Sequence, residues 1–134
     1  MSVMTEILFE KESYELIGLC MEVHRQLGPG FNEAIYREAL EIELMNHNIP
    51  FEREKRFLVD YKGHTLRKSF NADLVVYNSI ILEAKAVSAI IDKFIGVTMN
   101  YLRASRLKLG IIADFGERSF QSKRVVFGDY QITE

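Results

Sequence analysis

Cysteine is nearly absent from this chain, and so are the features of exported and membrane proteins. Cys20 is the only cysteine among 134 residues, so an internal disulfide and a cysteine-built metal cluster are excluded. It lies among Leu16, Ile17 and Val23, as a small core residue would. No stretch reaches the ~18 consecutive apolar residues of a membrane span. The start, MSVMTEILFEKES, carries glutamates where a signal peptide needs basic and then apolar residues. We therefore expect a cytoplasmic protein without membrane association.

The chain also has no strong excess of positive or negative charge. The formal net charge of −2 gives no global attraction to nucleic acid, so a polyanion would have to be held by local basic groups. Two such groups occur in the sequence, and their members are Arg53, Lys55, Arg56, Arg67 and Lys68 in the first group and Arg103, Arg106 and Lys108 in the second. Scattered, solvated charge is the default interpretation of each group, although either could contact phosphates.

Hydrophobic periodicity predicts three helices and five strands. The predicted elements are helices over 11–27, 32–46 and 88–104, and strands over 51–61, 66–77, 80–87, 107–115 and 123–127. The first helix begins at Ser13 or just before it, and Ser88 is a candidate N-cap of the third, which should pack across the sheet. The first three strands follow one another directly, which favours an antiparallel meander. Order ααβββαββ and the chain length predict one α/β domain over residues 1–134.

Two acids and a lysine interrupt the apolar stretch FNADLVVYNSIILEAKA, residues 70–86. Asp73 and Glu83 are symmetric about Asn78, so a three-residue hairpin loop would place them opposite each other, with Cβ atoms ~5 Å apart. Lys85 would project from the same face as Glu83, because side chains alternate along a strand. A two-residue loop would pair Asp73 with Ala84 instead and send the acids to opposite faces. The register of the hairpin therefore decides whether the acids meet.

Facing carboxylates suggest a metal site. They repel each other and are costly when covered, unless a cation or a shared proton compensates. Mg²⁺ binds a few carboxylates, carbonyls and waters and accepts a phosphate oxygen, and a nearby lysine can assist the attacking water. These parts suit hydrolysis of a phosphodiester. The ordinary alternative places Glu83 and Lys85 in solvent and Asp73 beside an arginine. The apolar residues on both faces of strand 80–87 favour the covered site.

Glu33 is a further acid with two interpretations. It shares a helical face with Tyr36 and Leu40, which is the face expected to meet the core. It can simply serve the helix N-terminus, where a negative charge is favoured. If its helix lies beside the strand hairpin, Glu33 supplies a third carboxylate to the same site.

Three other polar residues are secondary candidates. His24 falls among apolar residues of the first helix, where a lone histidine is usually a hydrogen-bonded packing residue. Tyr101 belongs to the apolar stripe of the third helix, and the neighbouring Asn100 is solvated in the ordinary interpretation.

The run LGPGFNEAIYREAL resembles the signature of the GxxExxY proteins, carried here by Gly30, Glu33 and Tyr36. The dipeptide AD at residues 72–73, EAK at 83–85, NYLRAS at 100–105 and LKLGIIADF at 107–115 follow in the order of that family. The resemblance covers roughly residues 10–127. It implies membership of the PD-(D/E)xK nuclease superfamily, with a restriction-endonuclease-like core in which helices flank a central mixed β-sheet.

The resemblance also implies roles for the candidate residues. Asp73 and Glu83 would be metal ligands, Lys85 the catalytic lysine and Glu33 the additional acid. Our leading hypothesis is that Mg²⁺ or Mn²⁺, held by these acids and the carbonyl of Ala84, supports hydrolysis of DNA, or as second choice RNA. Tyr36 joins His24, Asn100 and Tyr101 as a secondary candidate.

One position departs from the family pattern. Val97 stands four residues before the tyrosine of NYL, where the family typically has a glutamine. The alternative hypothesis is therefore a catalytically inactive nuclease-fold module that binds nucleic acid or a protein partner. A homo-oligomer is left open.

Overall fold

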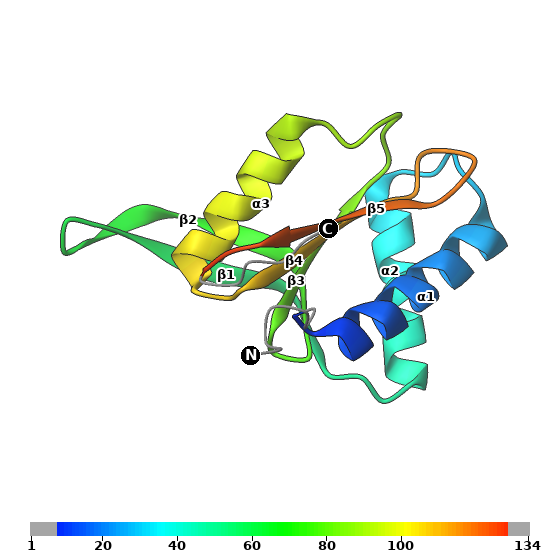
Figure 1. Cartoon of the computed structure of the whole chain (residues 1–134), viewed down its shortest axis with the longest axis horizontal. Helices are drawn as coiled ribbons and strands as arrows, with labels where there is room; N and C mark the ends of the chain where they lie inside the picture. The colour runs from blue at the N-terminus through cyan, green and yellow to red at the C-terminus, as the bar shows by residue number, and fades with distance from the viewer. Residues whose placement is uncertain (1–7, 129–134) are drawn as a thin grey trace, which may run out of the picture.

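The computed structural model describes residues 8–128, and within them three helices and five strands follow the predicted order ααβββαββ (Figure 1). The elements are α1 Glu10–Leu27, α2 Glu33–Asn46, β1 Phe51–Tyr61, β2 His64–Val76, β3 Ile80–Lys85, α3 Asp92–Ser105, β4 Leu109–Asp114 and β5 Gln121–Val126. Among these residues no helix is long and apolar enough to cross a membrane.

The five strands form one mixed sheet in the order β1-β2-β3-β4-β5. The first three are antiparallel, so the predicted meander is confirmed. β3 and β4 are parallel, and α3 makes the crossover that such a pair requires. Helices α1 and α2 cover one face of the sheet and α3 covers the other, which is the expected central mixed sheet flanked by helices (Figure 1).

The central strand β3 is buried on both faces because each face has its own core. Ile80 and Leu82 pack into the core under α1 and α2, together with Leu16. Ile81 packs into the core under α3, together with Leu102. A strand covered on both sides needs apolar residues at every position, and this explains the uninterrupted apolar run before Glu83.

The alternation of side chains along β1 shifts in the middle of the strand. Phe51 packs against the core under α1 and α2, whereas Phe57, six residues later, packs against the core under α3. Regular alternation would place both on one face. Glu54 lies between them with a left-handed backbone (φ 49°) and outside the paired register, so the phase changes at this residue. Glu54 stands opposite Asp73 of β2.

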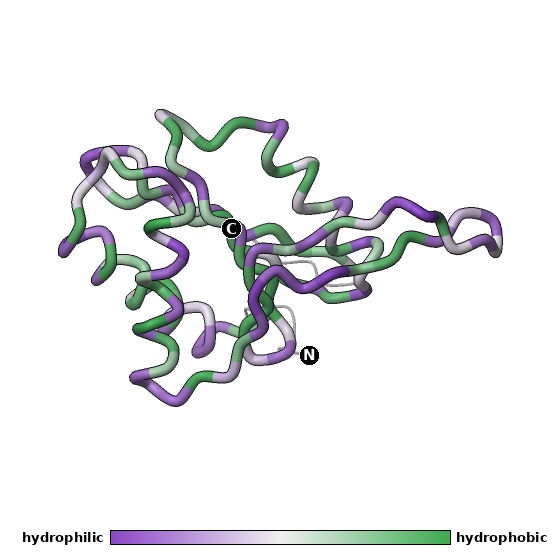
Figure 2. The backbone as a smooth tube through the Cα atoms, turned by 180° about the vertical axis from the view of Figure 1, so that it is seen from behind, coloured by the Kyte–Doolittle hydropathy of each residue, from purple (hydrophilic) through white to green (hydrophobic). Residues whose placement is uncertain are grey.

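The outer part of the β1–β2 hairpin projects beyond the layered body of the protein (Figures 1 and 2). At its tip, Lys62 and Gly63 both have positive φ, as a two-residue type I′ turn requires. Residues 60–69 are exposed. This segment therefore extends away from both cores.

The first helix begins earlier than the sequence predicted. α1 starts at Glu10, and the expected cap Ser13 lies inside the helix, where its hydroxyl donates to the carbonyl of Phe9 at 2.7 Å. The second helix starts as predicted, because the side chain of Asn32 accepts from the N–H of Ile35 and so caps α2.

The predictions for the end of β3 and the start of α3 were also wrong. β3 ends at Lys85 rather than at Val87, and α3 begins at Asp92 rather than at Ser88. The cause is Asp114 at the end of β4, whose Oδ1 accepts from the N–H of Val87 at 3.0 Å. This bond draws the chain after Lys85 into a loop, and α3 starts only after it.

Asp114 is the basis of a stability prediction. Its Oδ1 also accepts from the N–H of Gly116 at 2.9 Å, and the side chain is fully buried. Asp114→Ala leaves both donors without their acceptor, so we expect a loss of about 2–4 kcal/mol in unfolding free energy by urea denaturation in EDTA. Asp114→Asn keeps an acceptor oxygen and should cost much less.

The control is Asp60→Ala, which removes an exposed acceptor from the hydroxyl of Thr65. We expect it to change the unfolding free energy by less than about 1 kcal/mol. Equal losses for Asp114→Ala and Asp60→Ala would contradict this role of Asp114.

Candidate active site

The acid pair lies at the point where the pairing of β2 with β3 ends. The last paired residues are Leu74 and Leu82, so Asp73 and Glu83 come next and face each other. Beyond that point side chains replace backbone partners. The N–H of Asp73 donates to Oε2 of Glu83 at 3.0 Å, and the N–H of Ala84 donates to Oδ2 of Asp73 at 2.8 Å. The two acids thus cross-link the strands where the backbone ladder stops.

This register results from the hairpin loop of residues 77–79, which has the predicted three residues. Tyr77 and Asn78 both have left-handed backbones, and the N–H of Ser79 donates to the carbonyl of Val76 at 3.0 Å. This is the geometry of a type I′ turn followed by one extra residue. The prediction that the acids would be opposed is therefore confirmed, and the alternative two-residue loop is not found.

Glu83 carries the strongest electrostatic perturbation of the pair. Burial is the main reason that its pKa is raised to about 7; the negative charges of Asp73 and Glu33 also act to raise it, while the N–H bond from Asp73 and the charge of Lys85 act to lower it. Only 7% of the residue is exposed. The raised pKa therefore reflects burial first and the neighbouring carboxylates second.

Arg37 of α2 partly compensates the negative charge of these carboxylates. Its Nη1 donates to Oδ1 of Asp73 at 3.1 Å, and its Nη2 lies 3.6 Å from a carboxylate oxygen of Glu54. The side chains of Arg37 and Asp73 are 23% and 20% exposed, so this pair is largely covered. Asp73 thus has both an arginine and a backbone N–H as partners.

Lys85 extends from β3 toward α3. Its Nζ lies 4.8 Å from the ring centroid of Phe94, within cation–π range, and its backbone pairs with Asp114 of β4. Its charge lowers the pKa of Glu83, so the electrostatic influence of Lys85 reaches the acid pair. Asp73, Glu83 and Lys85 therefore gather on one region of the sheet.

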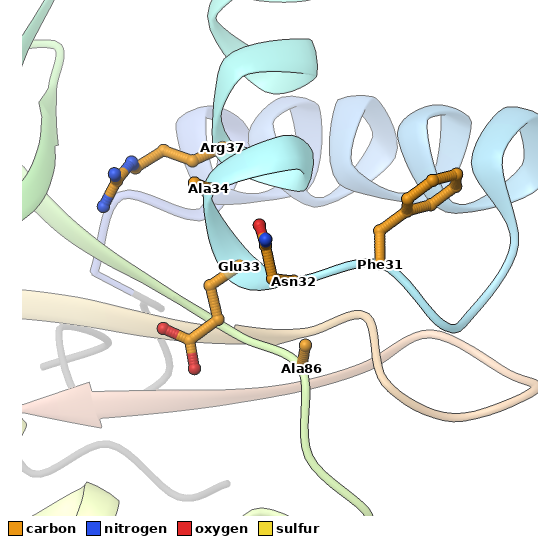
Figure 3. A pocket seen from close by; sticks show the side chains of 6 residues that line it. All are labelled: Phe31, Asn32, Glu33, Ala34, Arg37 and Ala86. Carbon is orange, nitrogen blue, oxygen red and sulfur yellow. The ribbon is translucent and has the colours of Figure 1, made fainter.

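Glu33 lies at the start of α2, in an open pocket of about 440 Å³ (Figure 3). The pocket is also lined by Phe31, Asn32, Ala34, Arg37 and Ala86, which is three residues after Glu83. Figure 3 shows Glu33 and Arg37 projecting from successive turns of α2 toward the strands, with Phe31 turned away. Glu33 is exposed and raises the pKa of Glu83. It borders the acid pair rather than the core.

Tyr36 holds the beginning of α2 in place. Its hydroxyl donates to the carbonyl of Gly28 at 2.5 Å and accepts from the N–H of Phe31 at 3.1 Å. Its buried ring stacks on Phe115 with centroids 4.8 Å apart. Gly30 has φ 117°, a conformation that favours glycine. Tyr36 is thus a positioning residue for the turn that presents Glu33.

The other secondary candidates lie in different places. Nε2 of His24 is 2.7 Å from the carbonyl oxygen of Glu117, so this buried histidine joins α1 to the loop between β4 and β5. Oδ1 of Asn100 accepts from Arg103 on the exposed side of α3. Burial raises the pKa of Tyr101, and the charges of Glu83 and Asp73 raise it further, so Tyr101 alone of these three borders the acid pair.

Arg37 and Glu54 are site residues that the sequence did not indicate. Arg37 follows Glu33 by four positions, which places both on one helical face, and this spacing could have suggested it. Glu54 carries no such signal, because its place opposite Asp73 depends on the pairing of β1 with β2.

The donor set fits a hard divalent cation. Asp73 and Glu83 offer carboxylate oxygens, and the carbonyl of Ala84 lies between Glu83 and Lys85 in β3. Burial and the charge of Asp73 raise the pKa of Glu83, and a bound cation would favour the ionised form of both acids. In the part of the chain described, no three His, Cys, Asp or Glu side chains are grouped closely enough to hold a metal. Mg²⁺ needs only one or two carboxylates beside waters, so the two opposed acids suffice.

Comparisons with known proteins agree with this arrangement. A family model described as the PD-(D/E)XK nuclease superfamily matches residues 10–125. A solved structure titled "Crystal structure of SSO0001" has a similar fold, with a TM-score of 0.57 and 20% sequence identity. The match covers 69% of this chain and 48% of that one, so this chain spans about half the length of that protein. The likeness supports the expected restriction-endonuclease-like core. No curated protein matches the chain significantly.

The raised pKa of Glu83 predicts a pH-dependent effect of Glu83→Gln. The pKa is about 7 in the folded protein against an ordinary value of 4.5, so the folded state binds the proton more tightly. The stability that this proton provides is complete below about pH 4.5 and is lost as the pH rises through about 7. A glutamine cannot ionise, so the variant should gain roughly 3 kcal/mol over the wild type between pH 5 and pH 8.

Urea denaturation in EDTA across this pH range measures the effect. Glu38→Gln, on the exposed side of α2, is the control for loss of a surface carboxylate. A stability difference between Glu83→Gln and the wild type that is the same at pH 5 and pH 8 would contradict the raised pKa.

Proposed function

Because this chain belongs to the PD-(D/E)XK nuclease superfamily, we propose that it hydrolyses phosphodiester bonds of DNA, with RNA as the less favoured substrate, using Mg²⁺ or Mn²⁺. The observation that carries the proposal is the opposition of Asp73 and Glu83 at the end of the β2–β3 ladder, with Lys85 two residues further on. Nucleases of this superfamily generally use divalent metal ions.

The proposed ligands are Asp73, Glu83 and the carbonyl of Ala84, with Glu33 as an additional acid at the border of the pocket. A bound Mg²⁺ would supply charge stabilisation at the phosphate and a water of lowered pKa. Asp73 and Glu83 are held for this role by the hydrogen bonds that cross-link β2 and β3. Lys85 assists the attacking water or stabilises the developing negative charge.

Arg37 has two roles in this proposal. Without a metal it neutralises Asp73, and so it lowers the cost of holding two opposed acids. When substrate is present, the same guanidinium lies beside the acids and is suited to contact a phosphate. Glu54, on its other side, limits the directions in which Arg37 can move.

The second candidate function is a catalytically inactive nuclease-fold module that binds nucleic acid or a protein partner. Val97 is the observation that favours it, because this half-exposed apolar side chain cannot make the hydrogen bonds of a glutamine. Four other expectations also stay predictions: membership of the GxxExxY group within the superfamily, a cytoplasmic location, a single domain over residues 1–134, and homo-oligomerisation.

The proposed hydrolysis predicts that purified protein nicks supercoiled plasmid when Mg²⁺ or Mn²⁺ is added and not in EDTA. Asp73→Asn and Lys85→Ala should each lower the rate by ~10²-fold or more, because each removes a charge that acts on the reacting phosphate. Asp92→Asn and Lys93→Ala, exposed in the first turn of α3, are the matched controls.

Isothermal titration with Mn²⁺ separates the two candidate functions. Metal binding that Asp73→Asn abolishes, together with nicking, supports the nuclease. Nicking that is unaffected by Asp73→Asn and Lys85→Ala would be due to a contaminant, and with no metal binding either it would end the nuclease proposal.

The pairing of Arg37 with Asp73 predicts the behaviour of Arg37→Met. In EDTA we expect a loss of about 1–2 kcal/mol in unfolding free energy, since Asp73 loses a partly covered cation. Added Mn²⁺ should raise the melting temperature of this variant more than that of the wild type, because the acids then lack an internal cation. Arg25→Met, which breaks the pair with Glu22 on the surface of α1, is the control. An equal Mn²⁺ effect in Arg37→Met and wild type would contradict this view of Arg37.

A further inference from the structure

Beyond its base, the projecting part of the β1–β2 hairpin packs against neither core. We call residues 55–71 the arm. Residues 60–69 are exposed on both faces of this two-stranded ribbon, and Leu58, Tyr61 and Leu66 are large apolar side chains exposed to solvent. Two strands alone are marginally stable in water, so an extended hairpin of this kind suggests a binding function.

The charge of the arm differs from that of the rest of the protein. It has five lysines and arginines against the single acid Asp60, a net charge of +4 within a chain of net charge −2. The residues outside the arm therefore carry −6. The side chains of Arg67 and Lys68 make no ion pair or hydrogen bond with any residue between 8 and 128. Their charges are available to a partner.

The arm is fixed in direction relative to the candidate active site. At its base Phe70 stacks on Tyr101 of α3 with centroids 4.2 Å apart, and Phe57 stacks on Phe70 at 5.4 Å. Asp73 follows the arm by two residues on the same strand, β2. The aromatic stack therefore determines where a molecule bound along the arm meets the acid pair.

Helix α3 adds basic residues beside the arm. A pocket of about 370 Å³ lies between them, lined by Val59 and Asp60 of the arm and by Asn100, Arg103, Ala104 and Arg106. Positive charge thus continues from the arm onto the C-terminal end of α3.

We propose that the arm is a DNA-binding element whose two-stranded ribbon enters the major groove of duplex DNA and holds the duplex against the acid pair. The proposal rests on the nuclease function proposed above, for which it names the form of the substrate. Arg67 and Lys68 contact backbone phosphates, and Arg103 and Arg106 extend the contact along the same strand.

Dimensions and composition favour duplex DNA over other nucleic acids. The major groove of B-DNA admits a two-stranded β-ribbon, whereas that of duplex RNA is too deep and narrow. Single-strand binding uses successive exposed aromatic rings, and Tyr61 is the only exposed phenylalanine, tyrosine or tryptophan of the arm. Arg67 lies six residues before Asp73 on β2, roughly 20 Å away at the rise of a strand, or about six base steps along a duplex.

The test measures binding separately from cleavage. Fluorescence anisotropy with a short labelled DNA duplex is recorded in EDTA at several salt concentrations between about 50 and 200 mM. Every protein in this assay also carries Asp73→Asn. The arm variant is Arg67→Ser with Lys68→Ser. The matched control is Arg118→Ser with Lys123→Ser, which removes the same charge from exposed positions at the opposite edge of the sheet.

We expect the arm variant to lower affinity roughly 10- to 100-fold at low salt and to reduce the salt slope by about 2, because two phosphate contacts are lost. The control pair should change both quantities little. Arg67→Lys with Lys68→Arg keeps the charges and should keep the affinity. An unchanged melting temperature shows that the arm variant is folded.

Three results would overturn the proposal. The first is equal loss of affinity in the arm variant and the control pair, which would indicate only a general charge effect. The second is an unchanged salt slope in the arm variant. The third is equal or tighter binding of a single strand or an RNA duplex of the same sequence.

The failure of this proposal can be told apart from failure of the nuclease function. Binding that depends on the arm, with no metal-dependent nicking by the wild type, supports the arm and contradicts the nuclease. Metal-dependent nicking that the arm variant retains at the wild-type rate and affinity supports the nuclease and contradicts the arm.

Discussion

The side-chain hydrogen bonds by which Asp73 and Glu83 join β2 to β3 determine how the rest of the structure is organised. At this point β2 continues outward with β1 while β3 continues with β4, so the backbone ladder between β2 and β3 must end. Two part-buried N–H groups would lose their partners there, and each would cost up to ~1–3 kcal/mol. The carboxylates of the two acids accept from those donors instead. The point at which β2 and β3 separate is therefore also the point at which the two carboxylates lie together.

The helices on both faces of the sheet place charged or aromatic residues near these two carboxylates. Burial and the neighbouring acids raise the pKa of Glu83, while Arg37 from α2 pairs with Asp73. The turn held by Tyr36 determines where α2 begins, and hence where Glu33 and Arg37 lie. On the other face, Lys85 lies against Phe94 of α3. Charged residues from α2, β2 and β3 thus approach one point of the sheet, which is costly for folding and valuable only if the site binds a cation or a charged ligand.

Local patterns were sufficient to predict most of the fold and the central acid pair. The strand 80–85 is recognisable because both of its faces are apolar, and the three-residue loop around Asn78 places the acids opposite each other. What local patterns could not supply are effects of distant contacts. Ser88 resembles a helix cap, but Asp114, 27 residues from Val87, accepts a hydrogen bond from the N–H of Val87. This bond holds residues 86–91 in a loop, so α3 begins only at Asp92. The partnership of Arg37 with Asp73 joins residues 36 positions apart, and the left-handed Glu54 has no sequence signal at all.

A crystal structure of the protein grown with MnCl₂, with anomalous diffraction data, tests most directly whether the opposed acids form a divalent metal site. We expect an anomalous peak about 2–2.5 Å from carboxylate oxygens of both Asp73 and Glu83, with Arg37 moved away from Asp73. A peak at some other place, or an acid pair still bonded to Arg37 with no bound metal, would contradict it.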